Sequence, residues 1–229
     1  MKTYSAFNND KDMKADLVNL AIKHEVADQY IAGTFGDSDA EVFQGCSVGC
    51  TINDFNNMHD LSIELGDHRA LAENLGVPPF ITILQDKLFE GLPTPQRYSF
   101  TPKLLTAINV GSDLTEVLPK CLKFVLEDLL DNLDEVESIG VREAVQGSLD
   151  VAANWVVIGV VDSDAARAAS EAASYAASYA ASEAASEAAS AVARAASYAA
   201  SEAAASEAAS DAAYTRYADH FIHLIKECK

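Results

Sequence analysis

The stretch EAASYAASYAASEAASEAAS, residues 171–190, repeats two alanines, a serine and one variable residue in units of four. Alanine is the strongest helix former, and serine and glutamate are tolerated within helices. More than half of residues 165–213 are alanine, and neither glycine nor proline occurs after Gly159. The tract therefore predicts a long helix, roughly 90 Å if about 60 residues form one element that rises about 1.5 Å per residue.

The phase of this repeat indicates how such a helix packs. Four residues advance a helix by about 400°, so the serines drift by about 40° around the axis with each repeat. A heptad coiled coil needs large apolar residues at two positions in every seven, and the tract lacks them. The pattern favours a helix that another helix, or the domain, approaches closely, because alanine side chains are small. A hairpin of two shorter helices stays open as an alternative.

Outside this tract the sequence has the composition of a folded domain. Because every glycine and proline lies within residues 1–159, we expect a compact α-rich domain over 1–159 and the helical tract over 160–213. Residues 214–229 follow as an amphipathic helix end that docks on the domain or on a second subunit. The fold class predicted is therefore mainly α. The apolar stripe of the helix end consists of Tyr214, Tyr217, Phe221, Leu224 and Ile225.

Apolar spacing, glycines and prolines divide the first 159 residues into elements. Pro119 lies inside one apolar stripe and predicts a kink or a restart of that helix. The helix that follows Pro78 is expected to bury its apolar residues Phe80, Ile83, Leu84 and Leu88. In chain order we predict a helix over 12–32 ended by Gly33, a loop over 33–43, a helix over 67–75 ended by Gly76, a helix opened by Pro78 and Pro79, a proline-rich connector over 91–102, an amphipathic helix over 112–134 and a helix or strand over 141–161.

The charge of the chain limits its partners. The formal net charge is −19 and the isoelectric point is about 4.4. Such a charge repels nucleic acid and anionic membranes, so we expect neither direct nucleic-acid binding nor membrane binding. The first residues lack a secretory apolar segment, and the longest apolar run, 151–161, is too short to span a bilayer. These features predict a cytoplasmic protein, whose cysteines are thiols or ligands rather than disulfides.

The stretch FQGCSVGCTIND, residues 43–54, is the strongest candidate for a metal-binding or catalytic site. Cys46 and Cys50 are four residues apart, which places both sulfurs on one face if the stretch is helical. A zinc site would need two more ligands, for which His24, His59 and His68 are available, although the spacing matches no standard zinc module. No cofactor is expected, and zinc is the alternative. A nucleophilic cysteine paired with His24, and a purely structural packing of small residues, stay open.

Two further pairs at four-residue spacing are candidates for a ligand or metal site. His24 and Asp28 share a predicted helix and are expected to form a buried hydrogen-bonded pair or to face the cysteines. Asp86 and Glu90 place two carboxylates on one face, which suits a cation or acid–base chemistry. Either pair is also compatible with an ordinary structural role.

Complete catalytic motifs are absent from the sequence. There is no phosphate loop, nucleophile elbow, zinc-protease helix or dinucleotide fingerprint, so an enzyme is not favoured. The densest acidic run, EDLLDNLDEVE over 127–137, is either a solvated helix face or a surface for a basic partner. The candidate partner-binding residues are Glu127, Asp128, Asp131, Asp134 and Glu135.

Four segments resemble a group of proteins found in bacteriophages, prophages and bacterial genomes. They are HEVADQYIAGTFG (24–36), FQGCSVGCTI (43–52), LGVPPFITILQDKLFEGLP (75–93) and LLTAINVGSDLTEVLP (104–119), followed by the alanine tract. The resemblance carries over no catalytic residues and implies a small accessory protein.

Three hypotheses for the function follow from these observations. The first is a non-enzymatic phage-type accessory protein that binds and inhibits a host protein, such as a defence or nucleic-acid-binding protein, through its acidic helical surface. The second is a small-ligand or metal-binding protein or enzyme that uses His24, Cys46 and Cys50. The third is a structural homo-oligomer built by pairing of the alanine helices.

Overall fold

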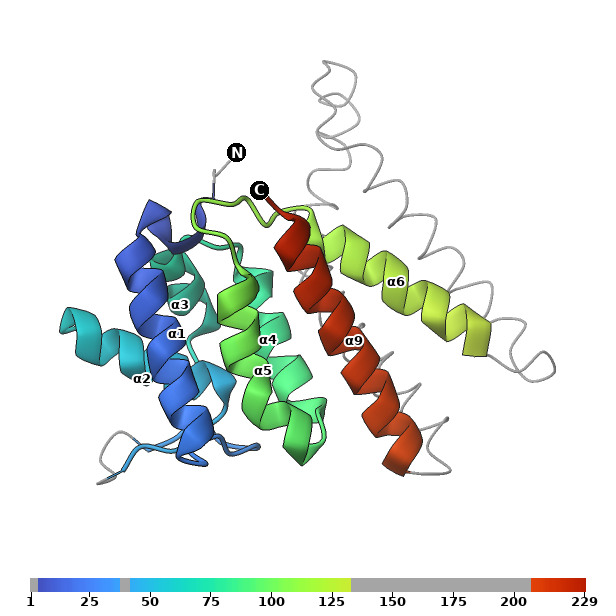
Figure 1. The fold of residues 1–229 in the computed structure, drawn as a ribbon, viewed down its shortest axis with the longest axis horizontal. Helices are drawn as coiled ribbons and strands as arrows, with labels where there is room; N and C mark the ends of the chain where they lie inside the picture. Colours follow the sequence, from blue (N-terminus) through green and yellow to red (C-terminus); the bar gives the residue numbers. More distant parts are fainter. Residues whose placement is uncertain (1–3, 38–41, 133–206) are drawn as a thin grey trace, which may run out of the picture. The chain divides into compact units, whose positions relative to one another are not determined.

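The computed structural model describes residues 4–37, 42–132 and 207–229, and helices dominate these ranges (Figure 1). They contain seven α-helices and no β-strand, which confirms the mainly α prediction. The alanine tract up to residue 206, the segment 141–161 and the predicted pairing of alanine helices lie outside the described residues. The helices are α1 (Lys11–Val26), α2 (Ser47–His59), α3 (His68–Leu75), α4 (Pro79–Gly91), α5 (Thr94–Ala107), α6 (Val117–Asn132) and α9 (Glu207–Glu227), preceded by a short turn, η1 (Ala6–Asn9).

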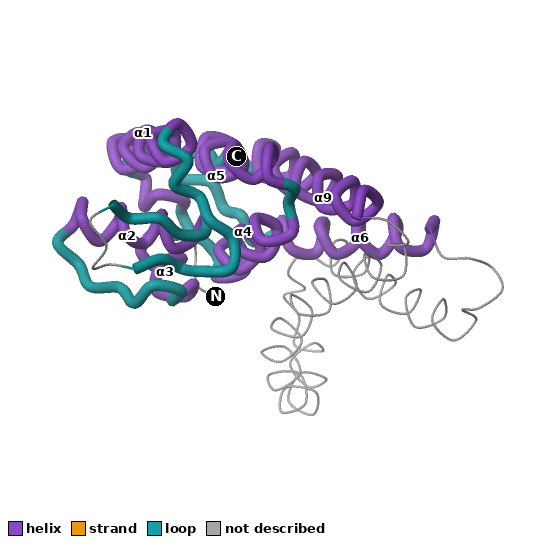
Figure 2. The backbone as a smooth tube through the Cα atoms, turned by 90° about the horizontal axis from the view of Figure 1, so that it is seen from below, coloured by secondary structure: helices purple, strands orange, loops and turns teal. Residues whose placement is uncertain are grey.

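The chain divides into two units. The first joins Met1–Val117 to Asp211–Lys229, and the second is Leu118–Ser210. In the first unit α1 packs on α5 and α2, while α4 packs on α2, α3 and α5. Figure 2 shows α1 and α5 in one layer, with α2, α3 and α4 in a second layer below it. The core of this unit lies between the two layers.

The predicted start of α3 and α4 is confirmed. The Asp67 side chain accepts a hydrogen bond from the N–H of Ala70 at 2.9 Å, which caps α3, and Gly76 ends it with a φ of 68°. Pro79 opens α4 because a proline in the first turn removes no intrahelical hydrogen bond. The buried face of α4 is broader than predicted and partly polar, since the helix packs on three neighbours. It consists of Ile81, Thr82, Leu84, Gln85, Asp86, Leu88 and Phe89, whereas Phe80 and Ile83 are half-buried.

Two predicted boundaries are wrong. The first helix ends at Val26 rather than near residue 32, because Asp28 adopts a left-handed φ of 53° that no α-helix continues. The segment 91–102 is not a connector, since α5 begins at Thr94 and keeps Pro102 inside it. A proline inside a helix removes one backbone hydrogen bond, and the buried position of Pro102 offsets that loss through packing.

The residues after α1 form an extended segment, which we call the strap (29–37). The strap is tied to the start of α2: the N–H of Ile31 donates to Gly45 O at 2.8 Å, and the N–H of Cys46 donates to Thr34 O at 2.7 Å. A Cβ at Gly49 would overlap the carbonyl of Phe35. Glycine there is therefore required for this close approach of two backbones. Gly49 thus has the tight packing expected for the GCSVGC stretch, while the roles of Cys46 and Cys50 stay predictions.

The C-terminal helix α9 contacts the N-terminal region, which is one of the two docking sites expected for it. Phe221 and Ile225 of α9 are fully buried, and the ring of Tyr214 lies against Gly91. The Asn109 side chain donates to the carbonyl of Cys228 at 2.7 Å and satisfies one of the open acceptors at the end of α9. The stripe is somewhat shifted, since Tyr214 and Leu224 are half-buried while Ala218 and Ile222 are buried.

The predicted amphipathic helix over 112–134 begins later than expected. The helix α6 starts at Val117, and Pro119 falls in its first turn. This matches the expected restart, because proline is tolerated where no intrahelical N–H is needed. Among the described helices, none is long and apolar enough to cross a lipid bilayer.

Candidate metal centre

The start of α2 fixes the position of Cys46. This residue is the N-cap, and its Sγ accepts a hydrogen bond from the N–H of Gly49 at 3.4 Å. The thiol donates to Oδ1 of Asp86 at 3.4 Å, and Cys46 is only 1% exposed. The backbone N–H at the helix start orients this sulfur and partly offsets the effect of burial on its thiolate form.

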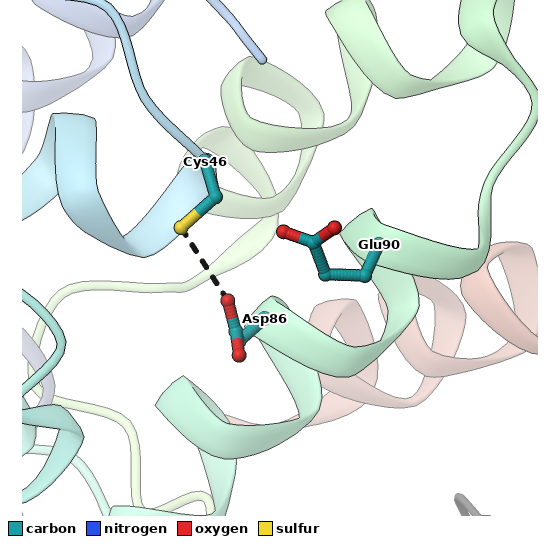
Figure 3. Close-up of side chains that lie close together, drawn as sticks. All are labelled: Cys46, Asp86 and Glu90. Atoms are coloured by element: carbon teal, nitrogen blue, oxygen red, sulfur yellow. Dashed lines mark hydrogen bonds between the residues drawn. The ribbon is translucent and has the colours of Figure 1, made fainter. Parts of the chain in front are cut away.

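Two carboxylates from successive turns of α4 converge on this sulfur. Asp86 is 4% exposed and Glu90 is half-buried. In Figure 3 the functional groups of Cys46, Asp86 and Glu90 point toward one another. Each of the three offers one ligand atom, and these atoms lie within 4.8 Å of one another. We call these three residues the donor cluster. The structure thus brings together residues from two of the predicted pairs. They are Cys46 from the cysteine pair, and both carboxylates of the pair Asp86 and Glu90.

Two groups of the donor cluster, Cys46 and Glu90, resist ionisation. Burial raises the pKa of the Cys46 thiol to about 12; the Gly49 N–H opposes this shift and the charge of Asp86 adds to it. Burial also raises the pKa of Glu90, although the N–H of Gly33 donates to its Oε2 at 2.7 Å and lowers it in part. Charging both of these groups beside Asp86 would crowd three anions together, which is unfavourable without a compensating cation.

Two basic side chains lie near Asp86. Nε2 of His68 is 3.3 Å from Oδ2 of Asp86, and Nζ of Lys87 is 4.0 Å from the same atom. The Lys87 side chain is 55% exposed, so water screens most of its charge. Nε2 of His68 is itself buried and has no hydrogen-bond partner among the described residues.

His24 belongs to a different cluster. Its Nδ1 lies 2.7 Å from Oε1 of Gln29, and its Nε2 lies 3.0 Å from both carboxylate oxygens of Asp54. Burial acts to lower the pKa of His24, but the hydrogen bond and the charge of Asp54, helped by Gln29, outweigh burial and raise it. The predicted pairing with Asp28 is wrong, because Asp28 lies beyond the end of α1 and is exposed.

Cys50 lies between the two clusters, one turn after Cys46. Its thiol donates to the carbonyl of Gly45 at 3.5 Å, and burial, with the charge of Asp54, raises its pKa above the usual range. Both ring nitrogens of His24 are held by Gln29 and Asp54. Within the part of the chain that the structure describes, no cysteine therefore has His24 as a hydrogen-bonded base.

A buried polar network fixes the helices that carry the donor cluster. Nε2 of Gln85 donates to Oγ of Ser47 at 2.7 Å, and Oγ1 of Thr101 donates to the same oxygen at 2.7 Å. These residues are fully buried and come from α4, α2 and α5. A satisfied buried network specifies one arrangement of its helices. The network holds Ser47, which follows Cys46, against Gln85, which precedes Asp86.

The predicted partner-binding residues are partly described. Oε1 of Glu127 accepts from Nζ of Lys123 at 2.6 Å, Asp128 is half-buried and Asp131 is exposed, all on α6. Asp134 and Glu135 lie outside the described residues. Partner binding by this surface stays a prediction.

Sequence reasoning missed Asp54 and could not choose among the histidines. Asp54 follows Cys50 by four residues, and this helical spacing was the available signal. His59 lies against the ring of Phe55, with 4.4 Å between ring centroids, whereas His68 faces Asp86. Comparison with models of protein families, with curated proteins and with solved structures finds no match for this chain.

Proposed function

We propose that this protein binds a divalent transition-metal ion through Cys46, Asp86 and Glu90, and that zinc is the ion. The observation that carries the proposal is the convergence of one sulfur and two carboxylates, with their ligand atoms within 4.8 Å of one another. Zinc accepts thiolate, imidazole and carboxylate ligands together, whereas magnesium and calcium prefer oxygen alone.

The surroundings of the donor cluster support ligation. The N–H of Gly49 donates a hydrogen bond to Sγ of Cys46, and the N–H of Gly33 donates one to Oε2 of Glu90. Such contacts orient ligands and set their basicity in metal sites. The Gly33 contact occupies one oxygen of Glu90 and leaves Oε1 for a metal ion.

The electrostatics of the site support a cation over a neutral ligand. Burial disfavours the anionic forms of Cys46 and Glu90, as their raised pKa values show. A divalent ion reverses this preference, because a coordinating thiol loses its proton to solvent when the metal–sulfur bond forms. Metal uptake is therefore expected to release protons and to weaken as the pH falls.

The experiment is equilibrium dialysis of the full chain against zinc, with bound metal measured by plasma mass spectrometry. We expect about one zinc per chain, and at least about a tenfold weaker affinity in Cys46→Ser and Asp86→Asn. Cys228→Ser and Asp16→Asn are the matched controls, since Cys228 lies after α9 and Asp16 is exposed on α1. A wild-type chain that binds no zinc, or a Cys46→Ser chain that binds it equally well, contradicts the proposal.

The net charge of −19 favours a second function, the binding and inhibition of a basic host protein. Here the acidic residues Glu127, Asp128 and Asp131 of α6 provide part of the surface. The test is the salt dependence of a complex purified from bacterial host lysate and identified by native mass spectrometry. Charge-driven association weakens with added salt, and neutralising these three residues weakens it further. A complex that is insensitive to both changes contradicts this function.

A further inference from the structure

His68 is held firmly beside the donor cluster. It is the first residue of α3, and its carbonyl accepts from Oγ1 of Thr82 at 2.8 Å. Its ring meets the Phe35 ring of the strap edge-on, with 5.7 Å between centroids. The imidazole is therefore positioned by α3, α4 and the strap together, with its Nε2 buried.

This nitrogen makes no hydrogen bond among the described residues, and it lies at ligand spacing from Asp86 alone. His68 is not one of the three residues whose ligand atoms lie within 4.8 Å of one another, so its ring must turn toward Cys46 and Glu90 to share their ion. Nε2 of His68 lies 3.3 Å from Oδ2 of Asp86, and Sγ of Cys46 lies 3.4 Å from Oδ1. Tetrahedral zinc, with bonds of about 2.0–2.3 Å, separates neighbouring ligand atoms by roughly 3.3–3.6 Å. A buried polar atom without a partner is rare in native proteins and calls for an explanation.

We propose that His68 is the fourth ligand of the zinc ion and closes the site, so that the metal is a structural clamp between α2, α3 and α4. This inference rests on the proposed metal binding by the donor cluster. Four protein ligands are typical of structural zinc, whereas catalytic zinc has three protein ligands and an open position for water. The fourth ligand therefore decides what kind of site this is.

The clamp would join three helices through residues that are far apart in the sequence. Cys46 lies at the start of α2, His68 at the start of α3, and Asp86 and Glu90 on α4. The loop from Asp60 to Asp67 that joins α2 to α3 contains no helix. Binding to the folded state alone stabilises that state by mass action. Zinc is accordingly expected to raise the melting temperature of the full chain.

The test uses cobalt(II) as a spectroscopic probe in the full chain. We expect a thiolate-to-cobalt charge-transfer band and strong visible bands of a four-coordinate ion, neither of which changes when azide is added. In His68→Asn the charge-transfer band stays, because Cys46 still binds. The visible bands weaken several-fold, azide changes them, and cobalt affinity falls about 10–100-fold. His59→Asn is the control, since His59 is exposed and lies outside the cluster.

The outcomes separate this inference from the proposal on which it rests. No charge-transfer band in the wild type contradicts metal binding at Cys46. A band in the wild type with an unchanged spectrum in His68→Asn, or an azide response in the wild type, contradicts only the role of His68. If His68→Asn does not fold, ¹⁵N spectra of histidine-labelled wild type decide. Zinc should shift the Nε2 resonance of His68, and an unmoved resonance overturns the inference.

Discussion

Two histidine–aspartate contacts lie in the same unit of this protein, and they differ in how their atoms are paired. In the first, His24 is bonded through both ring nitrogens, to Asp54 and to Gln29. In the second, Nε2 of His68 lies near Asp86 without a hydrogen bond, and Asp86 lies beside a buried thiol and a second carboxylate. The same residue types thus make a completed structural pair in one place and, in our proposal, an incomplete set of metal ligands in the other.

The largest difference is expected in stability. Below about pH 6.5, where the raised pKa keeps His24 protonated, Asp54→Asn leaves a buried imidazolium without its counter-charge. The substitution should then lower the free energy of unfolding by about 3–5 kcal/mol. Asp86→Asn removes one of three crowded acidic groups and should lower that free energy in the metal-free protein by about 1 kcal/mol or less. Urea unfolding of both variants measures this. Equal losses would show that the two contacts have the same structural role.

The strap connects the His24–Asp54 pair to the donor cluster. The Gln29 side chain is hydrogen-bonded to His24, and the N–H of Gly33 donates a hydrogen bond to Glu90. Gly49→Ala pushes the strap away from α2 and should lower the free energy of unfolding by about 2–3 kcal/mol, in the range of overpacked cores. It should also weaken zinc binding. Gly33→Ala is the control: Gly33 has a φ of 80° and open space around it, so alanine there costs about 1 kcal/mol. Similar losses for both variants would contradict the close approach at Gly49.

The pH dependence of stability separates the His24 pair from the donor cluster. The pKa of His24 is raised in the folded state, so its stabilising effect is complete below the unfolded pKa of about 6.5 and is lost as the pH rises through the folded value. The effect is about 1.4 kcal/mol for each unit of the shift. Denaturant unfolding between pH 6 and pH 9, in metal-free buffer, should show this fall in the wild type and in His59→Gln, but not in His24→Gln. A fall that survives in His24→Gln assigns it to another group.

The smallest effect is expected for Cys50. Its thiol donates to Gly45 O and takes no part in the donor cluster. Cys50→Ser keeps a donor in place and should lower the free energy of unfolding by about 1 kcal/mol. Zinc affinity should stay within about twofold of the wild type. A loss of zinc as large as that of Cys46→Ser would instead place both cysteines in one metal site, as the cysteine spacing alone suggested.

The local signals in the sequence predicted much of the fold. Asp67, Gly76 and Pro79 marked helix ends correctly, because caps and prolines act within one turn of the chain. Pro102 was misleading because packing kept it inside α5. Asp28 ended α1 early by taking up a left-handed conformation, which its residue type permits but does not require.

The candidate site was predictable in its parts and not in its assembly. The four-residue spacings placed Cys46 and Cys50 together, and likewise Asp86 and Glu90, since residues one helical turn apart share a face. That Asp86 and Glu90 meet Cys46, while Cys50 stays with Gly45, depends on how α4 packs on α2. Spacing within one helix carries no information on such a tertiary contact.

The most direct test of the account is a crystal structure of the full chain grown with zinc, with anomalous data collected on both sides of the zinc absorption edge. The account predicts one strong peak among Sγ of Cys46, the carboxylates of Asp86 and Glu90, and Nε2 of His68, at bond lengths of about 2.0–2.3 Å. A peak bound by the first three alone would keep the metal site and remove the clamp. The absence of any peak at Cys46 would contradict the central claim.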